Sequence, residues 1–281
     1  MLLQIYALVV GLCVGSFLNV CISRWPLEQS VVRPRSRCPN CGHEIAWFEN
    51  IPVVSWIALR ARCRGCGQPI SAVYPLVELS IGLVWFFSIR NFGADFTGLR
   101  MAVFFTILAG VAITDVKYYL IPDGFTISGL VFSVVSAFAA PFLGESFFFA
   151  GPLDSVMGAC VGAGLIAIIG WLGEVVLGKE AMGMGDMTLM AFVGAALGPE
   201  RALATVFLGA TIGAVIFLVI VYPITLLRKR PAQPVEVAVE GSAAETTPGF
   251  PLVPFGVFLA PAAVITLLWG DLLIARVFPG L

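Results

Sequence analysis

Apolar runs long enough to cross a membrane recur along almost the whole chain. A spanning helix needs about 20 mostly apolar residues, and the chain is 59% hydrophobic and only 12% charged. Its mean hydropathy is +0.98. The sixth run is short and rich in Gly and Ala, so its limits are the least defined. The pattern predicts an all-α polytopic membrane protein with about eight transmembrane helices, at residues 2–22, 74–90, 99–116, 124–142, 157–178, 182–198, 202–227 and 252–275.

The first run is interpreted as a retained helix rather than a cleaved signal peptide. No Lys or Arg precedes it, Arg24 follows it, and no small-residue cleavage site closes it. A signal peptide usually carries a basic start and such a site.

Basic residues are distributed unevenly, although the net charge is only −1. Twelve of the 16 Lys and Arg residues follow the predicted first, third, fifth and seventh helices, and seven of these twelve lie between the first and second helices. Short cytoplasmic loops carry an excess of Lys and Arg. The large first loop is therefore predicted to be cytoplasmic, and both termini are predicted to lie outside.

Two polar stretches interrupt the apolar pattern. Residues 23–73 form the only insert large enough to fold, but about 50 residues bury too little apolar surface to be stable without a cross-link or a metal. Residues 231–250 are rich in Pro, Glu, Ala, Ser and Thr, as in a flexible loop. We expect a first helix at 1–22, a cytoplasmic loop domain at 23–73, and a transmembrane domain at 74–281 that contains the flexible cytoplasmic loop 231–250.

Four of the seven cysteines form two Cys-x-x-Cys-Gly motifs within the insert. Two such motifs can bring four thiolates to one tetrahedral metal ion, and the Gly after each pair relieves the tight turn. Four thiolates close the coordination shell, so the metal would be structural zinc. The predicted ligands are Cys38, Cys41, Cys63 and Cys66.

Two other roles suit these cysteines less well, disulfide bonds and a thioredoxin-like redox function. Disulfides would be reduced on the cytoplasmic side of the membrane, and no strand–helix pattern of thioredoxin type surrounds either pair. His43 follows the second cysteine closely. It is interpreted as a spare exposed histidine rather than a fifth ligand.

Two aspartates lie at the ends of apolar runs, where a carboxylate costs at least a few kcal/mol. Asp115 ends the third predicted helix, and Asp186 follows Gly183-Met184-Gly185 at the start of the sixth. Glycine inside a helix is unfavourable unless backbone must approach another group closely, here a partner helix or a substrate. The topology puts both carboxylates at the cytoplasmic ends of their helices. We therefore expect Asp115 and Asp186 to form a pair.

Structural roles could also explain these acids. Asp115 could pair with Lys117, but residues two apart face different sides of a helix. Asp186 could be the N-cap of the sixth helix, and Asp123 the N-cap of the fourth. For Asp123 the capping and the functional interpretations are about equally supported.

A pair of carboxylates suits peptide hydrolysis. Two close carboxylates can share one proton, so that one takes a proton from water while the other polarises the scissile carbonyl. Gly183, Gly185 and Asp123 are candidate binding residues beside the pair. Asn19 and Glu78 flank the cysteine loop and are further candidates, with hydrogen bonding between helices as the alternative.

The order of these motifs resembles the bacterial type IV prepilin peptidases, or prepilin leader peptidase/N-methyltransferases, over nearly the whole length. Gly-x-Gly-Asp alone is less specific, since presenilin-like and signal-peptide-peptidase-like intramembrane proteases share it. The matching segments are Gly15-Ser16-Phe17-Leu18-Asn19-Val20, Arg24-Trp25-Pro26, Arg33 to Cys41, Asn50-Ile51-Pro52, the second cysteine pair, Tyr74 to Leu79, Thr114 to Asp123, Gly183 to Asp186, and Pro254-Phe255-Gly256.

The resemblance implies a specific reaction. The enzyme would remove a short basic leader from type IV prepilins or pseudopilins of pili or type II secretion, on the cytoplasmic side of a bacterial inner membrane. The cut falls after a Gly and before a hydrophobic residue, often Phe. Many members then methylate the new N-terminus with S-adenosylmethionine. The family's catalytic aspartates fall on Asp115 and Asp186. Its cysteine quartet, which some members lack, falls on the four cysteines named above.

Two alternatives belong to other functional classes. One is a transporter in which the acidic pair relays protons or binds cations, although no inverted repeat of the transporter kind is evident. The other is a methyltransferase in which the aspartates are structural. No Rossmann-type glycine fingerprint marks a nucleotide site, so the sequence does not locate a methyl donor. A nucleic-acid partner is not expected.

Overall fold

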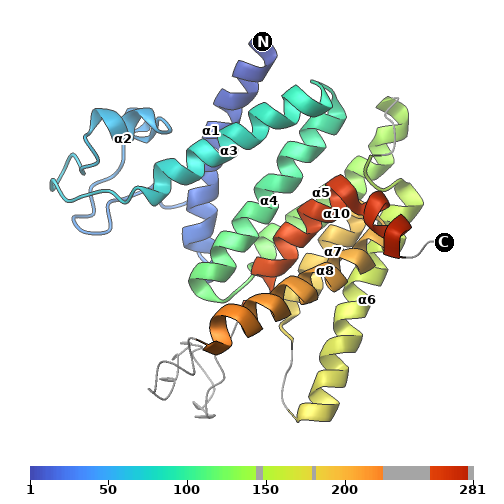
Figure 1. Cartoon of the computed structure of the whole chain (residues 1–281). Helices are drawn as coiled ribbons and strands as arrows, with labels where there is room; N and C mark the ends of the chain where they lie inside the picture. The colour runs from blue at the N-terminus through green and yellow to red at the C-terminus, as the bar shows by residue number, and fades with distance from the viewer. Residues whose placement is uncertain (144–147, 179–181, 224–253, 278–281) are drawn as a thin grey trace.

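The computed structural model describes residues 1–143, 148–178, 182–223 and 254–277, and every regular element in these ranges is helical (Figure 1). Apolar runs give long helices, and Gly or Pro lies at most of the boundaries. The elements are α1 (Leu2–Arg24), η1 (Trp25–Leu27), η2 (Trp47–Asn50), α2 (Val54–Ala58), α3 (Val73–Phe92), α4 (Phe96–Tyr118), α5 (Asp123–Ala139), η3 (Ala140–Leu143), α6 (Pro152–Leu177), α7 (Met184–Leu197), α8 (Pro199–Ile216), the π-helical turn η4 (Phe217–Val221) and α10 (Gly256–Val277).

Seven helices in the described ranges are long and apolar enough to cross a membrane, compared with the eight predicted. The connections after α3, α4 and α7 are short, whereas the insert joins α1 to α3 and the short helix α7 lies between α6 and α8. The seven spans are Leu2–Leu27, Val73–Phe92, Phe96–Tyr118, Asp123–Leu143, Pro152–Val176, Pro199–Ile220 and Gly256–Arg276.

The sixth predicted span, 182–198, is present as an apolar helix, Met184–Leu197, but it is shorter than the seven spans above. Helix α7 has only 14 residues, so it is about 21 Å long against a bilayer core of about 30 Å. Gly198, with φ of 86°, ends the helix and α8 starts directly after it. The second half of α7 is buried, and α5, α6 and α8 pack around it. It is therefore a short apolar helix that runs through the interior of the bundle, covered by its neighbours.

Glycines let two helix pairs approach closely. A Cβ at Gly11 would lie 2.7 Å from Trp85, and one at Gly15 would lie 2.8 Å from the Cα of Glu78, so α1 and α3 touch almost backbone to backbone. Helices α6 and α7 do the same, because a Cβ at Gly158 or Gly162 would overlap a carbonyl oxygen of α7. Small residues at such contacts are typical of membrane helices, which associate by close packing.

The predicted cysteine insert projects from the bundle between α1 and α3, apart from the other helices (Figure 1). At the same end of the bundle α4 terminates and α5, α7 and α10 begin, because residues from all four helices meet there. The predicted loop 231–250 and the basic residues Lys179 and Arg228–Arg230 lie outside the described residues.

Candidate active site and metal centre

Asp115 and Asp186, predicted to form a pair, line the same cavity of about 550 Å³. Asp115 lies in the last turn of α4, and Asp186 in the first turn of α7. The two carboxylates are near enough for the charge on Asp115 to act on Asp186. The fold thus brings together two acids that are 71 positions apart in the sequence.

Asp115 is held in place by the start of α10. Its residue is only 4% exposed, and its Oδ2 accepts a hydrogen bond of 2.9 Å from the backbone amide of Val257. The amide of Gly256 also faces this carboxylate. A helix N-terminus offers free N–H groups and a partial positive charge, which suits a carboxylate at that position.

Asp186 does not cap its helix, so the N-cap interpretation is wrong. The N-cap of α7 is Gly183, and Asp186 sits three residues into the helix. The amide of Gly183 lies against its carboxylate. The other oxygen, Oδ1, is buried, and no described residue hydrogen-bonds to it. A buried oxygen without a partner is costly, and Asp186 is also one of the residues that line the cavity.

The other structural explanations also fail. No ion pair among the described residues includes Asp115, and the Lys117 ammonium lies over the Tyr118 ring, 4.8 Å from its centre. Pro122, rather than Asp123, is the N-cap of α5. Asp123 is the exposed first residue of that helix and lines the aspartate cavity.

The two glycines before Asp186 differ in what they contact. A Cβ at Gly185 would lie 2.9 Å from the Cβ of Ile121, so the loop after α4 packs directly on the α7 backbone. A Cβ at Gly183 would meet no atom closer than 3.8 Å, and that atom is Oδ2 of Asp186. Close approach of a partner segment therefore explains Gly185 but not Gly183, although both line the cavity.

The cavity also contains residues that sequence reasoning did not single out for it. Trp25 and Glu28, after α1, line one wall, and Tyr119 and Ile121, after α4, line another. Gly256 packs directly on the carboxylate of Asp115, because a Cβ there would lie 2.8 Å from Oδ2. The sequence places Arg24-Trp25-Pro26 and Pro254-Phe255-Gly256 only among the segments that resemble the family. No local pattern shows that they lie near the aspartates.

The four cysteines meet in one cluster, with all Sγ atoms within 4.8 Å of one another. The Sγ atoms of Cys38 and Cys66 are 3.9 Å apart, and those of Cys41 and Cys63 are 4.0 Å apart. Four sulfurs at about 2.3 Å around a tetrahedral ion are separated by about 3.8 Å. The cluster therefore fits a single metal ion, and the cysteines do not form disulfides.

Each cysteine pair is built as the same small hairpin. In the first, the Gly42 amide donates to the Cys38 carbonyl at 2.9 Å. In the second, the Gly67 amide donates to the Cys63 carbonyl at 2.8 Å. Both glycines have positive φ, 73° and 70°, which side chains disfavour. The amides of Cys41 and Asn40 lower the pKa of Cys38 to about 6, as expected when backbone N–H groups face the sulfur.

Glu49 links the two cysteine hairpins from one side of the cluster. His43 is not among the four ligands; its Nε2 instead lies 3.1 Å from Oε2 of Glu49. Arg64 lies 3.4 Å from the other Glu49 oxygen. The Ala46 amide, followed by His43 and Arg64, holds the pKa of Glu49 below its usual range. Glu49 thereby joins the two hairpins through residues next to their ligands.

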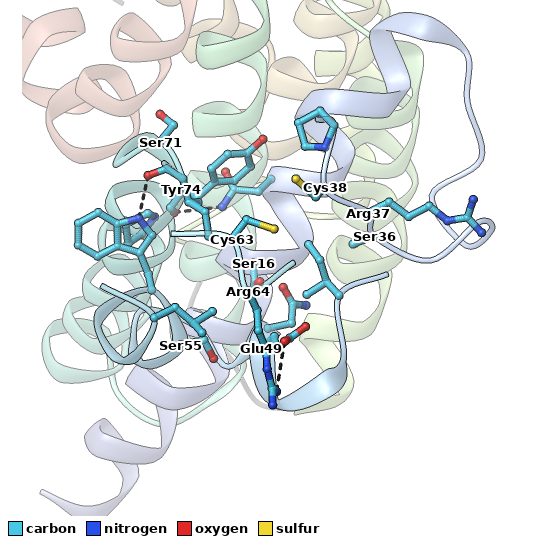
Figure 2. Close-up of a pocket in the computed structure, with 18 of the residues that line it drawn as sticks. Ser16, Ser36, Arg37, Cys38, Glu49, Ser55, Cys63, Arg64, Ser71 and Tyr74 are labelled. Carbon is cyan, nitrogen blue, oxygen red and sulfur yellow. Dashed lines mark hydrogen bonds and ion pairs between the residues drawn. The ribbon is translucent and has the colours of Figure 1, made fainter. Parts of the chain in front are cut away.

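Asn19 and Glu78, predicted as binding residues, line a different cavity from the aspartates. This second cavity, of about 480 Å³, lies between the insert and the ends of α1 and α3 (Figure 2). Asn19 Nδ2 donates to the Tyr74 carbonyl at 3.1 Å, and Glu78 Oε2 accepts from the Val53 amide at 2.7 Å. Both side chains are buried.

Comparison with known proteins places the two halves of the chain in matching families. Residues 9–92 match the bacterial peptidase A24 N-terminal domain, and residues 102–218 match the type IV leader peptidase family. The first match contains the cysteine insert, and the second contains both aspartates. No solved structure matches the chain.

Several curated relatives share one name, prepilin leader peptidase/N-methyltransferase. The chain is 47% identical to the prepilin leader peptidase/N-methyltransferase of Myxococcus xanthus, over 76% of the chain and 62% of that protein. It is 35% identical to that of Stutzerimonas stutzeri, over 94% and 90%, and 33% identical to that of Pseudomonas aeruginosa, over 94% and 89%. Together with a helical membrane bundle that brings Asp115 and Asp186 to one cavity, these matches show that the chain belongs to the bacterial type IV prepilin leader peptidase/N-methyltransferase family of A24 aspartic peptidases.

Proposed function

We propose that this protein cleaves the leader from type IV prepilins or pseudopilins, with Asp115 and Asp186 as the catalytic pair. The observation that carries the proposal is their position: one acid from α4 and one from α7 face one cavity at the insert end of the bundle. Family membership supports the same reaction.

The two aspartates have different surroundings, which suggests different tasks. Asp115 is oriented by a hydrogen bond from the Val257 amide at the start of α10. Asp186 has a buried oxygen with no described partner. In the proposed mechanism the ionised carboxylate takes a proton from the attacking water, and the protonated one polarises the scissile carbonyl. The proton then passes to the leaving amine.

The surroundings of the pair suit a substrate that is part helix and part polar leader. Exposed apolar residues, among them Val116, Leu120 and Met184, lie beside the aspartates at the bundle surface. Glu28 and Asp123 line the same cavity and could face a basic leader. We expect Gly183 and Gly185 to lie along the bound peptide, with the Gly–Phe type bond over the carboxylates.

We propose that the cysteine cluster holds structural zinc. Four thiolates at tetrahedral separations leave no open position for a substrate. Zinc would supply a cross-link that the insert needs, because this segment is too small to be stable by burial alone.

We further propose N-methylation of the new N-terminus, with S-adenosylmethionine as the methyl donor. The support is the name of the relatives, each a prepilin leader peptidase/N-methyltransferase. The membrane would be a bacterial inner membrane, with the insert and both aspartates on the cytoplasmic side, and both termini outside. The arginines of the insert favour this orientation.

Co-expression with a prepilin tests the peptidase, with leader removal and methylation both measured by mass spectrometry. Asp115→Asn and Asp186→Asn should each lower cleavage at least about 100-fold, with the protein still in the membrane. Asp154→Asn is the matched control, since Asp154 is exposed in the first turn of α6 and lines neither cavity.

Normal cleavage by either active-site variant would refute the proposal that Asp115 and Asp186 are the catalytic pair. Methylation that persists without any peptidase activity would favour the methyltransferase alternative, and substrate flux into vesicles without cleavage would favour a transporter.

A further inference from the structure

We propose that the second cavity binds the methyl donor, as a zwitterionic sulfonium nucleoside held between Glu78 and Arg24. This inference rests on the proposed methyltransferase function and gives it a location. The cavity is distinct from the aspartate cavity and is formed by the insert on one side and by α1 and α3 on the other (Figure 2). Its volume of about 480 Å³ is in the usual range for small-molecule sites.

Glu78 would face the positive charge of the ligand. It is 8% exposed, and the Val53 amide donates to its Oε2 at 2.7 Å. Gly15 packs against its Cα, so the side chain is fixed from two directions. No ion pair in the described ranges includes it. A buried carboxylate without a positive partner is costly, and a cationic ligand group would offset that cost.

Arg24 would face the negative charge of the ligand. Its guanidinium donates to the Ser30 carbonyl at 2.9 Å, which leaves most of its donors for another acceptor. It lines the same cavity as Glu78, and it too is absent from the ion pairs of the described residues. Two opposite charges that line one cavity without pairing match a ligand that carries both signs.

Aromatic side chains would hold the nucleobase of the ligand. Trp56 and Tyr74 line this cavity, and the Trp56 indole is fixed by a hydrogen bond of 3.1 Å to the Ile70 carbonyl. Flat aromatic faces suit a nucleobase. The aspartate cavity offers no such combination, since its lining contains four acids and no Lys or Arg.

The two cavities meet at one point of the chain. Arg24 lines the proposed donor cavity, and the next residue, Trp25, lines the aspartate cavity. Trp25 packs closely on Gly124, and its ring centre lies 4.5 Å from that of Phe125 in an edge-to-face arrangement. In the proposal, a new N-terminus formed at the aspartates moves past this segment to reach the donor.

Methyl transfer to the new N-terminal amine needs no reactant besides the bound donor. The bound donor supplies a methyl carbon whose bond to sulfur breaks as the bond to the amine nitrogen forms, and the sulfur keeps the electron pair as a neutral thioether. The methylated amine then releases one proton to water. The role of Glu78 and Arg24 is to bind and orient.

Binding of S-adenosylmethionine to the purified full-length protein, measured by calorimetry without prepilin, tests the site. Glu78→Gln and Arg24→Gln should each raise Kd at least about tenfold. Glu174→Gln and Arg90→Gln are matched controls on exposed positions that line neither cavity, and should leave Kd unchanged. Asp115→Asn should abolish cleavage and still bind the donor. Unchanged binding by both cavity variants would overturn the proposal.

Photo-crosslinking of the same ligand gives a result that does not depend on how the variants fold. Adducts within 16–24, 49–56 or 70–78 would support the site, whereas adducts confined to 115–124 or 183–186 would overturn it. Equal competition by glycerophosphoethanolamine would indicate a lipid headgroup site instead. If cleavage persists but no donor binds, the site is refuted while the peptidase proposal stands.

Discussion

The Asp115 carboxylate accepts a hydrogen bond of 2.9 Å from the Val257 amide, although 142 residues separate the two in the chain. The start of α10 thus forms the floor beneath one of the two aspartates. It can do so because Gly256, the preceding residue, has no side chain to keep the helix away from the carboxylate.

Gly256→Ala should therefore impair cleavage without removing either aspartate. The new Cβ would lie 2.8 Å from Oδ2 of Asp115 and 2.7 Å from Ile121, so one of them must move. A displacement of about 1 Å at a catalytic group can lower the rate about 100-fold. The measurement is kcat/KM on a purified prepilin. Wild-type kcat/KM for this variant would show that the close approach does not position Asp115.

Gly162→Ala should destabilise the bundle, whereas Gly164→Ala should not. A Cβ at Gly162 would overlap the Met190 carbonyl of α7, but one at Gly164 would meet nothing within 4 Å. Overpacking of this kind costs about 2 kcal/mol. Thermal unfolding in detergent compares the two variants, which differ by only two positions on α6. Equal melting temperatures would contradict the close α6–α7 contact.

Removal of the metal should unfold the insert and leave the helices intact. The insert has only one short α-helix, two short 3₁₀ turns and two isolated β-bridges of its own, so metal binding and folding are coupled. A strong chelator, or Cys63→Ser, should expose Arg60, Arg62 and Arg64 to trypsin while the helical circular dichroism persists. Resistance of the metal-free insert to trypsin would show that it folds without the ion.

Glu49→Gln should weaken metal retention, with Glu44→Gln as the matched control. Glu49 is buried and contacts both His43 and Arg64, beside a ligand in each hairpin. Glu44 pairs only with Arg37, and both are more than half exposed. Loss of a group that orients metal ligands commonly lowers affinity about tenfold or more. Zinc release to a competing chelator measures the difference, and equal release rates would refute a supporting role for Glu49.

Several features follow from the sequence because they depend on neighbouring residues. The length of each apolar run predicts a spanning helix, and seven such helices are present. The two Cys-x-x-Cys-Gly motifs build their hairpins from bonds within a few residues, with Gly42 and Gly67 in the left-handed region. The depth of Asp115 and Asp186 follows from the ends of their runs, which is why their meeting in one cavity could be anticipated.

Tertiary structure decided the rest, because it depends on which distant surfaces pack together. Apolar composition alone does not distinguish a helix covered by protein from one facing lipid, so it does not show that the 14-residue α7 is surrounded by α5, α6 and α8. Nor does it show that Gly256 and Val257 support Asp115, or that Glu78 and Asn19 line a cavity apart from the aspartates. Those relationships arise from backbone contacts between helices far apart in the chain, which no local pattern encodes.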